Sequence, residues 1–233
     1  TITFILVFSN LVGGATLVYL APRKSAGVLL LPSYAWTLLV SLAGIPFLLF
    51  LRLVDPAYIL HVCILSALSS FTAIHTSLLI GRERIAASNF IGLIQPVLIV
   101  LSLAIFFFVL DRHDISAYIW SLYLSFGISL AVSLFYIFRL TGPLARSSFK
   151  ESLAVTGEMF RLGLWNQVAH ITQILSFRMS FYVLDSYHGD SAVGVYSNGI
   201  SLAESVWLIA KSISLVQYAR IATSLQWISC SYL

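Results

Sequence analysis

Polar side chains recur in the stretch from Met159 to Glu204, which otherwise has the composition of two membrane-spanning helices. Such groups are costly at membrane depth, so they are usually paired with one another or functional. Amides and imidazoles can hydrogen-bond a polyhydroxylated ligand, a guanidinium can bind an anion, and a carboxylate can carry a proton. The polar residues are Asn166, Gln167, His170, Gln173, Arg178, Asn198 and Glu204.

Helical geometry, at about 100° per residue, divides the first half of this stretch into faces. Asn166, His170 and Gln173 share one face, whereas Arg178 points well away from it. That polar face could line a cavity or make interhelical hydrogen bonds. Arg178 lies about six residues from one end of its predicted helix, so it could line a cavity or snorkel to the membrane surface.

Glu204 is harder to explain by packing, because about twelve residues separate it from the helix end and place it near mid-bilayer. There it must be paired, protonated or in contact with water. Lys211 lies in the same broad arc and could snorkel to the opposite surface. His75 and Gln95 lie on polar faces of two earlier segments, and both His75 and His170 could be hydrogen-bonded core histidines.

The composition predicts an all-α polytopic membrane protein. Of 233 residues, 59% are apolar and 9% are charged, whereas about a quarter of the residues of a soluble domain are charged. Apolar runs of about 20 residues cross a membrane as helices, because no water is available there for free backbone groups. About seven such runs are present: Thr1 to Leu20, Val28 to Leu53, Ala57 to Ile80, Ala86 to Leu110, Ile115 to Phe138, Phe160 to Leu184 and Ala192 to Tyr218.

Lysine and arginine in the short connections predict the orientation of these spans. One side receives eight bases and three acids, and the other receives two bases and five acids. We therefore expect the basic side to be cytoplasmic, the N-terminus to lie outside, and the C-terminal part with Arg220 to lie inside. The eight bases are Arg23, Lys24, Arg82, Arg84, Arg139, Arg146, Lys150 and Arg161.

Several functional classes are disfavoured by the sequence. It has no cluster of metal ligands, no glycine loop for phosphate and no Ser/His/Asp arrangement, so we expect neither an enzyme nor a bound cofactor. Cys63 and Cys230 fall in a span and in an inner tail, which argues against a disulfide. The net charge of +4 is explained by the basic connections and indicates contact with anionic membrane lipids, not nucleic acid.

Four short motifs, in their order and spacing, resemble the start of the second half of the prokaryotic polysaccharide (O-antigen) flippases. These proteins belong to the multidrug/oligosaccharidyl-lipid/polysaccharide exporter superfamily and show the pattern G…R-x-D…V-G-x-Y-x-x-A…L-x-E. Ser180 replaces the usual acid and Gly199 the usual alanine, so the resemblance does not extend to an Arg–Asp pair. The matching residues are Gly163, Arg178, Val193 to Tyr196 and Leu202 to Glu204.

The resemblance extends over nearly the whole chain. Asn10 to Lys24 is similar to the second helix and the basic loop after it, and Leu79 to Asn89 to the turn between helices four and five. Since these flippases have about twelve to fourteen helices in two lobes, we expect a fragment that holds helices two to eight. The implied parts are residues 1–139 of the first lobe, a cytoplasmic inter-lobe connection at 140–158, two helices of the second lobe at 159–220, and a tail at 221–233.

The resemblance also implies a function in surface polysaccharide biosynthesis at the bacterial plasma (inner) membrane. Such flippases move an undecaprenyl-pyrophosphate-linked oligosaccharide outward by alternating access, for O-antigen, capsule or exopolysaccharide, alongside polymerase and chain-length machinery. Arg178 and Lys211 would contact the pyrophosphate, and Glu204 would carry a coupling proton or pair with a cation. A fragment alone would be inactive. The implied sugar-contact residues are Asn166, His170, Gln173, His75 and Gln95.

Two other functions remain open. A multidrug exporter of the same superfamily would share the lobes but favour an acidic, aromatic cavity, which Arg178 and Lys211 disfavour. A seven-helix receptor or retinal protein would fit the number of spans and the lysine in the last one. However, Lys211 lies too close to the inner end for a mid-membrane Schiff base, and the span Ala57 to Ile80 contains no acidic counter-ion.

Overall fold

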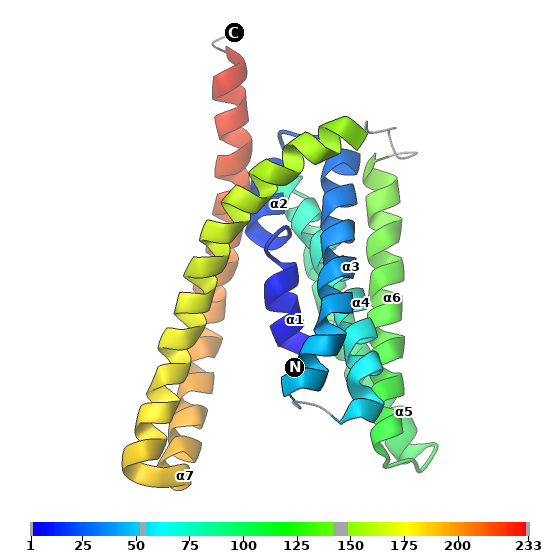
Figure 1. Ribbon diagram of the computed structural model, residues 1–233, viewed down its shortest axis with the longest axis vertical. Helices are drawn as coiled ribbons and strands as arrows, with labels where there is room; N and C mark the ends of the chain where they lie inside the picture. Colours follow the sequence, from blue (N-terminus) through cyan, green and yellow to red (C-terminus); the bar gives the residue numbers. More distant parts are fainter. Residues whose placement is uncertain (1, 52–54, 142–148, 232–233) are drawn as a thin grey trace.

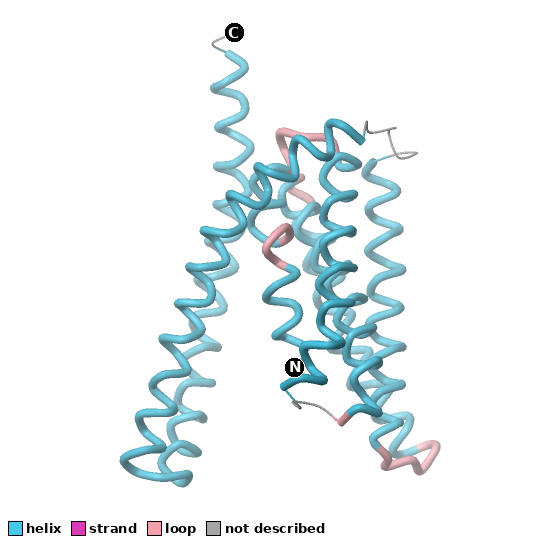
Figure 2. Tube along the Cα trace, in the orientation of Figure 1, coloured by secondary structure: helices cyan, strands magenta, loops and turns pink. Residues whose placement is uncertain are grey.

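The computed structural model describes residues 2–51, 55–141 and 149–231, and nearly all of them are helical (Figures 1 and 2). No strand occurs among these residues, so the predicted all-α class is confirmed. The helices are α1 (Ile2–Ser9), α2 (Gly14–Leu20), α3 (Ala26–Leu51), α4 (Pro56–Gly81), α5 (Ile85–Phe108), α6 (Ile115–Thr141) and α7 (Phe149–Ser231).

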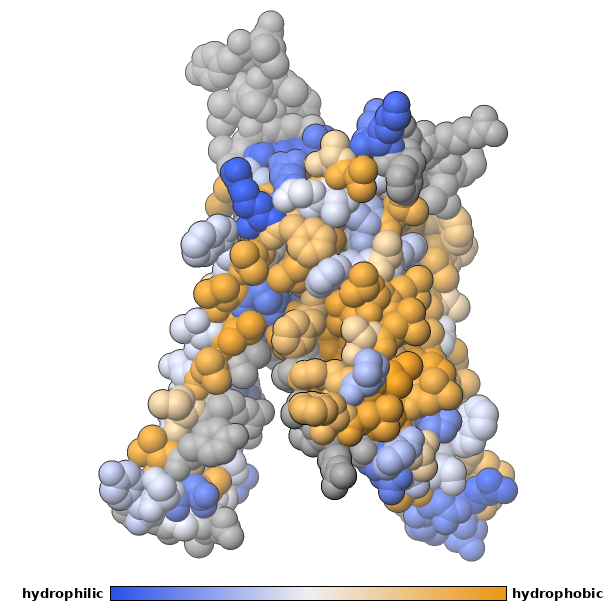
Figure 3. All heavy atoms as spheres, in the orientation of Figure 1, coloured by the Kyte–Doolittle hydropathy of each residue, from blue (hydrophilic) through white to orange (hydrophobic). Residues whose placement is uncertain are grey.

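Five segments within the described residues are long and apolar enough to cross a membrane. They are Ala26–Phe50, Pro56–Gly81, Ile85–Phe108, Ile115–Leu140 and Val193–Tyr218. The outward surface of the bundle formed by α1 to α6 is also apolar over much of its length (Figure 3), and Phe50 and Phe108 are 85% and 89% exposed. This chain therefore has the helix lengths and the apolar surface of a membrane protein.

The first predicted span, Thr1 to Leu20, is wrong as a single regular helix. Residues 10–13 separate α1 from α2, and here the Gly13 amide donates to the Asn10 carbonyl at 3.1 Å. Gly14 then adopts a φ of +50°, which glycine reaches without a steric penalty. The predicted span Phe160 to Leu184 is helical, but its polar side chains keep it out of the five apolar segments.

The helix α7 consists of two limbs that meet at Gly189, where φ is 72° and ψ is −179°. This backbone conformation is accessible almost only to glycine, so Gly189 forms the turn of a hairpin (Figure 1). The turn falls where the sequence predicts a connection between the last two spans. We call residues 149–188 the first limb and residues 190–231 the returning limb.

The first limb begins earlier than predicted. The sequence predicts a connection over 140–158, but α7 begins within it at Phe149, while residues 142–148, with Arg146, lie outside the described residues. Ser152, Val155 and Met159 are 2%, 6% and 0% exposed, and their helical spacing forms a stripe that faces the bundle. The later part of the predicted connection therefore packs as a helix across one end of the bundle (Figure 2).

The bundle is closed at this end by a close contact between α2 and α4. Leu17 of α2 and Leu78 of α4 are fully buried in the main apolar cluster. A Cβ on Gly81 would lie 2.6 Å from the Cβ of Ala21 and 2.7 Å from the carbonyl oxygen of Val18. The absence of a side chain at Gly81 therefore allows the two helices to pack this closely.

We expect Gly81→Ala to destabilise the protein by about 1–3 kcal/mol, because the added methyl group would force α2 and α4 apart. Gly92→Ala is the matched control, since no heavy atom lies within 4 Å of a Cβ built there. It should be neutral or stabilising by about 0.5–1 kcal/mol, as alanine favours a helix interior. Unfolding midpoints of the purified variants in detergent provide the comparison, and equal stabilities would contradict the close contact.

Candidate functional site

The first limb of α7 reaches the backbone of the bundle at Gly163. A Cβ on Gly163 would overlap the carbonyl of Leu11, so only glycine allows this approach. Leu11 lies between α1 and α2, where the helix is interrupted. Beyond this contact the hairpin diverges from the bundle, and the space-filling view shows an open gap between them, which we call the notch (Figures 1 and 3).

Two buried polar atoms near this contact have no hydrogen-bond partner within the described residues. They are Nε2 of Gln167 and Oγ1 of Thr16, and the two residues are 6% and 2% exposed. Gln167 follows Gly163 by about one turn, and the Thr16 hydroxyl lies 3.4 Å from the Cβ position of Gly163. The contact at Gly163 therefore brings two polar side chains, Gln167 and Thr16, into the buried interface between α7 and the bundle.

Asn166 lies in a cavity of about 420 Å³ between α2 and the two limbs of α7. Tyr19 lines the same cavity, and the Arg23 guanidinium lies 4.1 Å from the centre of the Tyr19 ring. Tyr218 of the returning limb donates a long hydrogen bond of 3.4 Å to the carbonyl of Ala15. The closed end of the notch therefore combines an amide, two phenols and a nearby cation.

The other predicted residues of α7 lie farther along its limbs. The backbones of Arg178 and Lys211 belong to α7, but their side chains lie outside the described part of the structure. Arg178 follows Gln167 by about three turns, so its backbone position is on the face that meets the bundle at Gln167. The predicted residues of α7 with exposed side chains beyond the cavity are His170, Gln173 and Glu204.

His75 does not line the notch but links three helices inside the bundle. It is 1% exposed, with Nε2 against the hydroxyl of Tyr34 in α3 and Nδ1 2.6 Å from Oγ of Ser133 in α6. Ser133 donates its one proton to the Leu130 carbonyl at 2.8 Å, so Nδ1 of His75 must be the donor to Ser133. Nε2 then accepts from Tyr34, and His75 is the hydrogen-bonded core histidine that the sequence left as an alternative.

Four serines of α6 form a buried row that the sequence analysis missed. Ser121, Ser125, Ser129 and Ser133 are all 0% exposed, and their four-residue spacing places them on one helix face. Small residues let membrane helices approach closely, and Ser125 donates to the carbonyl of Gln95 in α5 at 2.7 Å. The serine repeat in α6 is the signal that could have found this face. Gln95, a predicted sugar contact, is half-buried beside it.

Basic residues gather at the end of the bundle where the notch is closed. Nη2 of Arg82 donates to the carbonyl of Lys24 at 2.8 Å, which ties the α4–α5 turn to the α2–α3 turn. Burial lowers the pKa of Arg82 from its usual value, because the charged form loses solvation. Arg84 and Arg139 line a groove of about 690 Å³ at the same turn, so this end presents several cations.

The described residues contain no group of three or more His, Cys, Asp or Glu side chains that could hold a metal ion. Comparison with models of protein families, with curated proteins and with solved structures gave no match. Function must therefore be inferred from the arrangement of the chain's own residues.

We expect His75 and Ser133 to be energetically coupled. His75→Phe and Ser133→Ala should each destabilise the bundle by about 0.5–2 kcal/mol, and the double variant should cost less than the sum, because both changes break the same hydrogen bond. Unfolding of the four proteins in detergent measures the coupling. Ser102→Ala is the control partner for His75→Phe, since the Ser102 hydroxyl bonds only within its own helix. The link would be disproved if the destabilisations of His75→Phe and Ser133→Ala were fully additive, as those of His75→Phe and Ser102→Ala should be.

Proposed function

We propose that this chain is part of a transporter that moves a lipid-linked oligosaccharide across the bacterial plasma membrane. The observation that carries the proposal is the hairpin of α7, which is held to the bundle at Gly163 and diverges from it toward Gly189 (Figure 1). Alternating access needs such an arrangement, because one helical unit must rock against another around the substrate. The resemblance to prokaryotic polysaccharide flippases supports the same interpretation.

The notch would receive the sugar part of the substrate. Asn166, His170 and Gln173 supply amide and imidazole groups along the first limb, and sugar hydroxyls can donate to and accept from both kinds of group. All three side chains are exposed. Because polar groups at membrane depth are stable only beside water or a polar partner, this limb suits a polyhydroxylated substrate better than lipid tails.

Arg178 would bind the pyrophosphate of the carrier lipid. Its backbone position is on the face of the first limb that meets the bundle at Gln167, and farther along the limb this face borders the notch. A guanidinium binds phosphate oxygens through two parallel hydrogen bonds. Lys211 of the returning limb would add a second cation, and Glu204 would exchange the coupling proton or pair with a cation.

We further propose seven membrane passages with the N-terminus outside and the C-terminus inside, in which α1 and α2 together form one passage. The basic end, with Arg82, Arg84 and Arg139, would then face the cytoplasm, because cytoplasmic connections are rich in lysine and arginine. In this orientation the notch opens outward. The arrangement would correspond to the state from which the oligosaccharide is released.

Complementation of a bacterial strain that lacks its own polysaccharide flippase tests this proposal. The complete reading frame that contains this chain should restore surface polysaccharide. Arg178→Ala should abolish the polysaccharide while the protein remains in the membrane in normal amount. Arg178→Lys should retain part of the activity, because a lysine keeps the charge but loses the bidentate geometry.

Arg161→Ala is the matched control for these variants, since Arg161 is an exposed arginine of the same limb near the basic end. It should leave the amount of surface polysaccharide unchanged. Near-normal transport by both Arg178 variants would contradict the role assigned to Arg178. Resistance to organic cations without restored polysaccharide would indicate a multidrug exporter and contradict the proposed substrate.

A further inference from the structure

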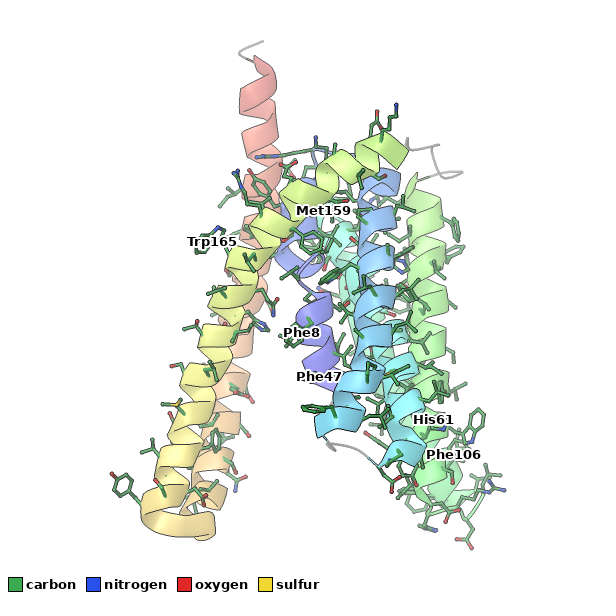
Figure 4. All side chains as sticks on the ribbon, viewed as in Figure 1. Phe8, Phe47, His61, Phe106, Met159 and Trp165 are labelled. Atoms are coloured by element: carbon green, nitrogen blue, oxygen red, sulfur yellow. The ribbon has the colours of Figure 1, made fainter. Side chains whose placement is uncertain are left out.

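A second pocket lies at the end of the bundle opposite the basic end. Its volume is about 890 Å³, and it lies between the first turns of α4 and the first turns of α6. Figure 4 labels His61 in this region, at the end of the molecule away from Met159. We call it the end pocket, and its wall includes Tyr58, His61, His113, Asp114, Trp120 and Tyr123.

A hydrogen bond between α4 and α6 fixes two groups of the end pocket. Nδ1 of His61 lies 3.0 Å from the hydroxyl of Tyr123, and the two rings meet edge to face with their centres 5.8 Å apart. This bond holds the imidazole of His61 in one orientation. Nε2 of His61 has no hydrogen-bond partner among the described residues, so it is available to a ligand.

A carboxylate and aromatic faces complete the wall of the end pocket. Asp114 is exposed immediately before α6, and its carboxylate has no hydrogen bond or ion pair with another described residue. Trp120 is 62% exposed, and its ring centre lies 6.0 Å from that of Tyr123, with the planes tilted by 51°. Tyr58 adds a third ring from α4. Hydrogen-bonding groups and apolar ring faces therefore meet in one concavity.

Tryptophan and tyrosine also gather at membrane interfaces, where they bind no specific ligand. An interfacial belt presents its rings to lipid, whereas the rings here line one concavity together with His61 and Asp114. A carboxylate does not contribute to anchoring in lipid. The volume also falls within the range of about 300–1,000 Å³ that is typical of small-molecule sites, so the end pocket has the properties of a ligand site.

We propose that the end pocket binds a saccharide of one or two rings. The apolar C–H face of a sugar ring can stack on an aromatic side chain, while its hydroxyls donate to the Asp114 carboxylate and bond to the His61 imidazole. The end pocket is separate from the notch, and binding there does not depend on transport. In the proposed orientation it lies outside, where a translocated oligosaccharide would arrive.

The test uses the full chain in lipid nanodiscs, with maltose and di-N-acetylchitobiose as probes and saturation-transfer NMR as the measurement. At least one disaccharide should bind, with a Kd on the order of 1 mM. Asp114→Asn and Trp120→Ala should each weaken binding at least about tenfold, because each removes a principal contact. Tyr118→Ala and Asp185→Asn are controls at exposed residues outside the end pocket, and should leave the Kd unchanged.

Failure of both disaccharides to bind would overturn this proposal, and so would binding that persists in Asp114→Asn and Trp120→Ala. Binding of choline in place of the sugars would assign the end pocket to an organic cation and overturn it as well. Both test residues are exposed, so unfolding midpoints should stay unchanged and exclude misfolding as the cause of lost binding. The complementation assay measures transport separately, so normal surface polysaccharide without saccharide binding would contradict only this inference.

Discussion

The close approach of Gly163 to the Leu11 carbonyl determines how α7 is attached to the rest of the molecule. It needs two local features that are far apart in the sequence, a glycine in the first limb and an interruption between α1 and α2. A regular helix over Thr1 to Leu20 would present side chains to the limb and prevent this contact. Because the attachment is near one end of the hairpin, the other end can lie away from the bundle (Figure 1).

Polar groups in the bundle and on the hairpin differ in how they are satisfied. His75 is buried and bonded to Tyr34 and Ser133, so its contribution is to hold α3, α4 and α6 together. His170 and Gln173 are exposed on α7, where a membrane environment would make them unfavourable unless water or a polar ligand were present. The exposed polar groups of the hairpin therefore need water or a polar ligand in a membrane, whereas His75 in the bundle interior is already hydrogen-bonded.

The helical class and the hairpin turn could be predicted, because apolar runs must be helical in a membrane and Gly189 lies in a short polar connection. The interruption at residues 10–13 was missed, although Asn10 and the pair Gly13-Gly14 are helix-breaking signals within the apolar run. The helix from Phe149 was missed because its apolar stripe lies within a polar segment. The partners of His75 lie 41 and 58 positions away in the sequence, and helical periodicity carries no information about which faces meet. The serine repeat of α6 was also missed, but its four-residue spacing can be recognised in the sequence.

Pulsed electron spin resonance distances test most directly whether α7 is fixed at one end and can move at the other. After replacement of both native cysteines, spin labels at Tyr187 and Leu60 report the open end of the notch, and labels at Leu153 and Arg139 report the closed end. We predict a broad or double-peaked distribution at the open end and one narrow peak at the closed end, which Gly163→Ala should broaden. Narrow distributions at both ends, with no effect of Gly163→Ala, would contradict the account.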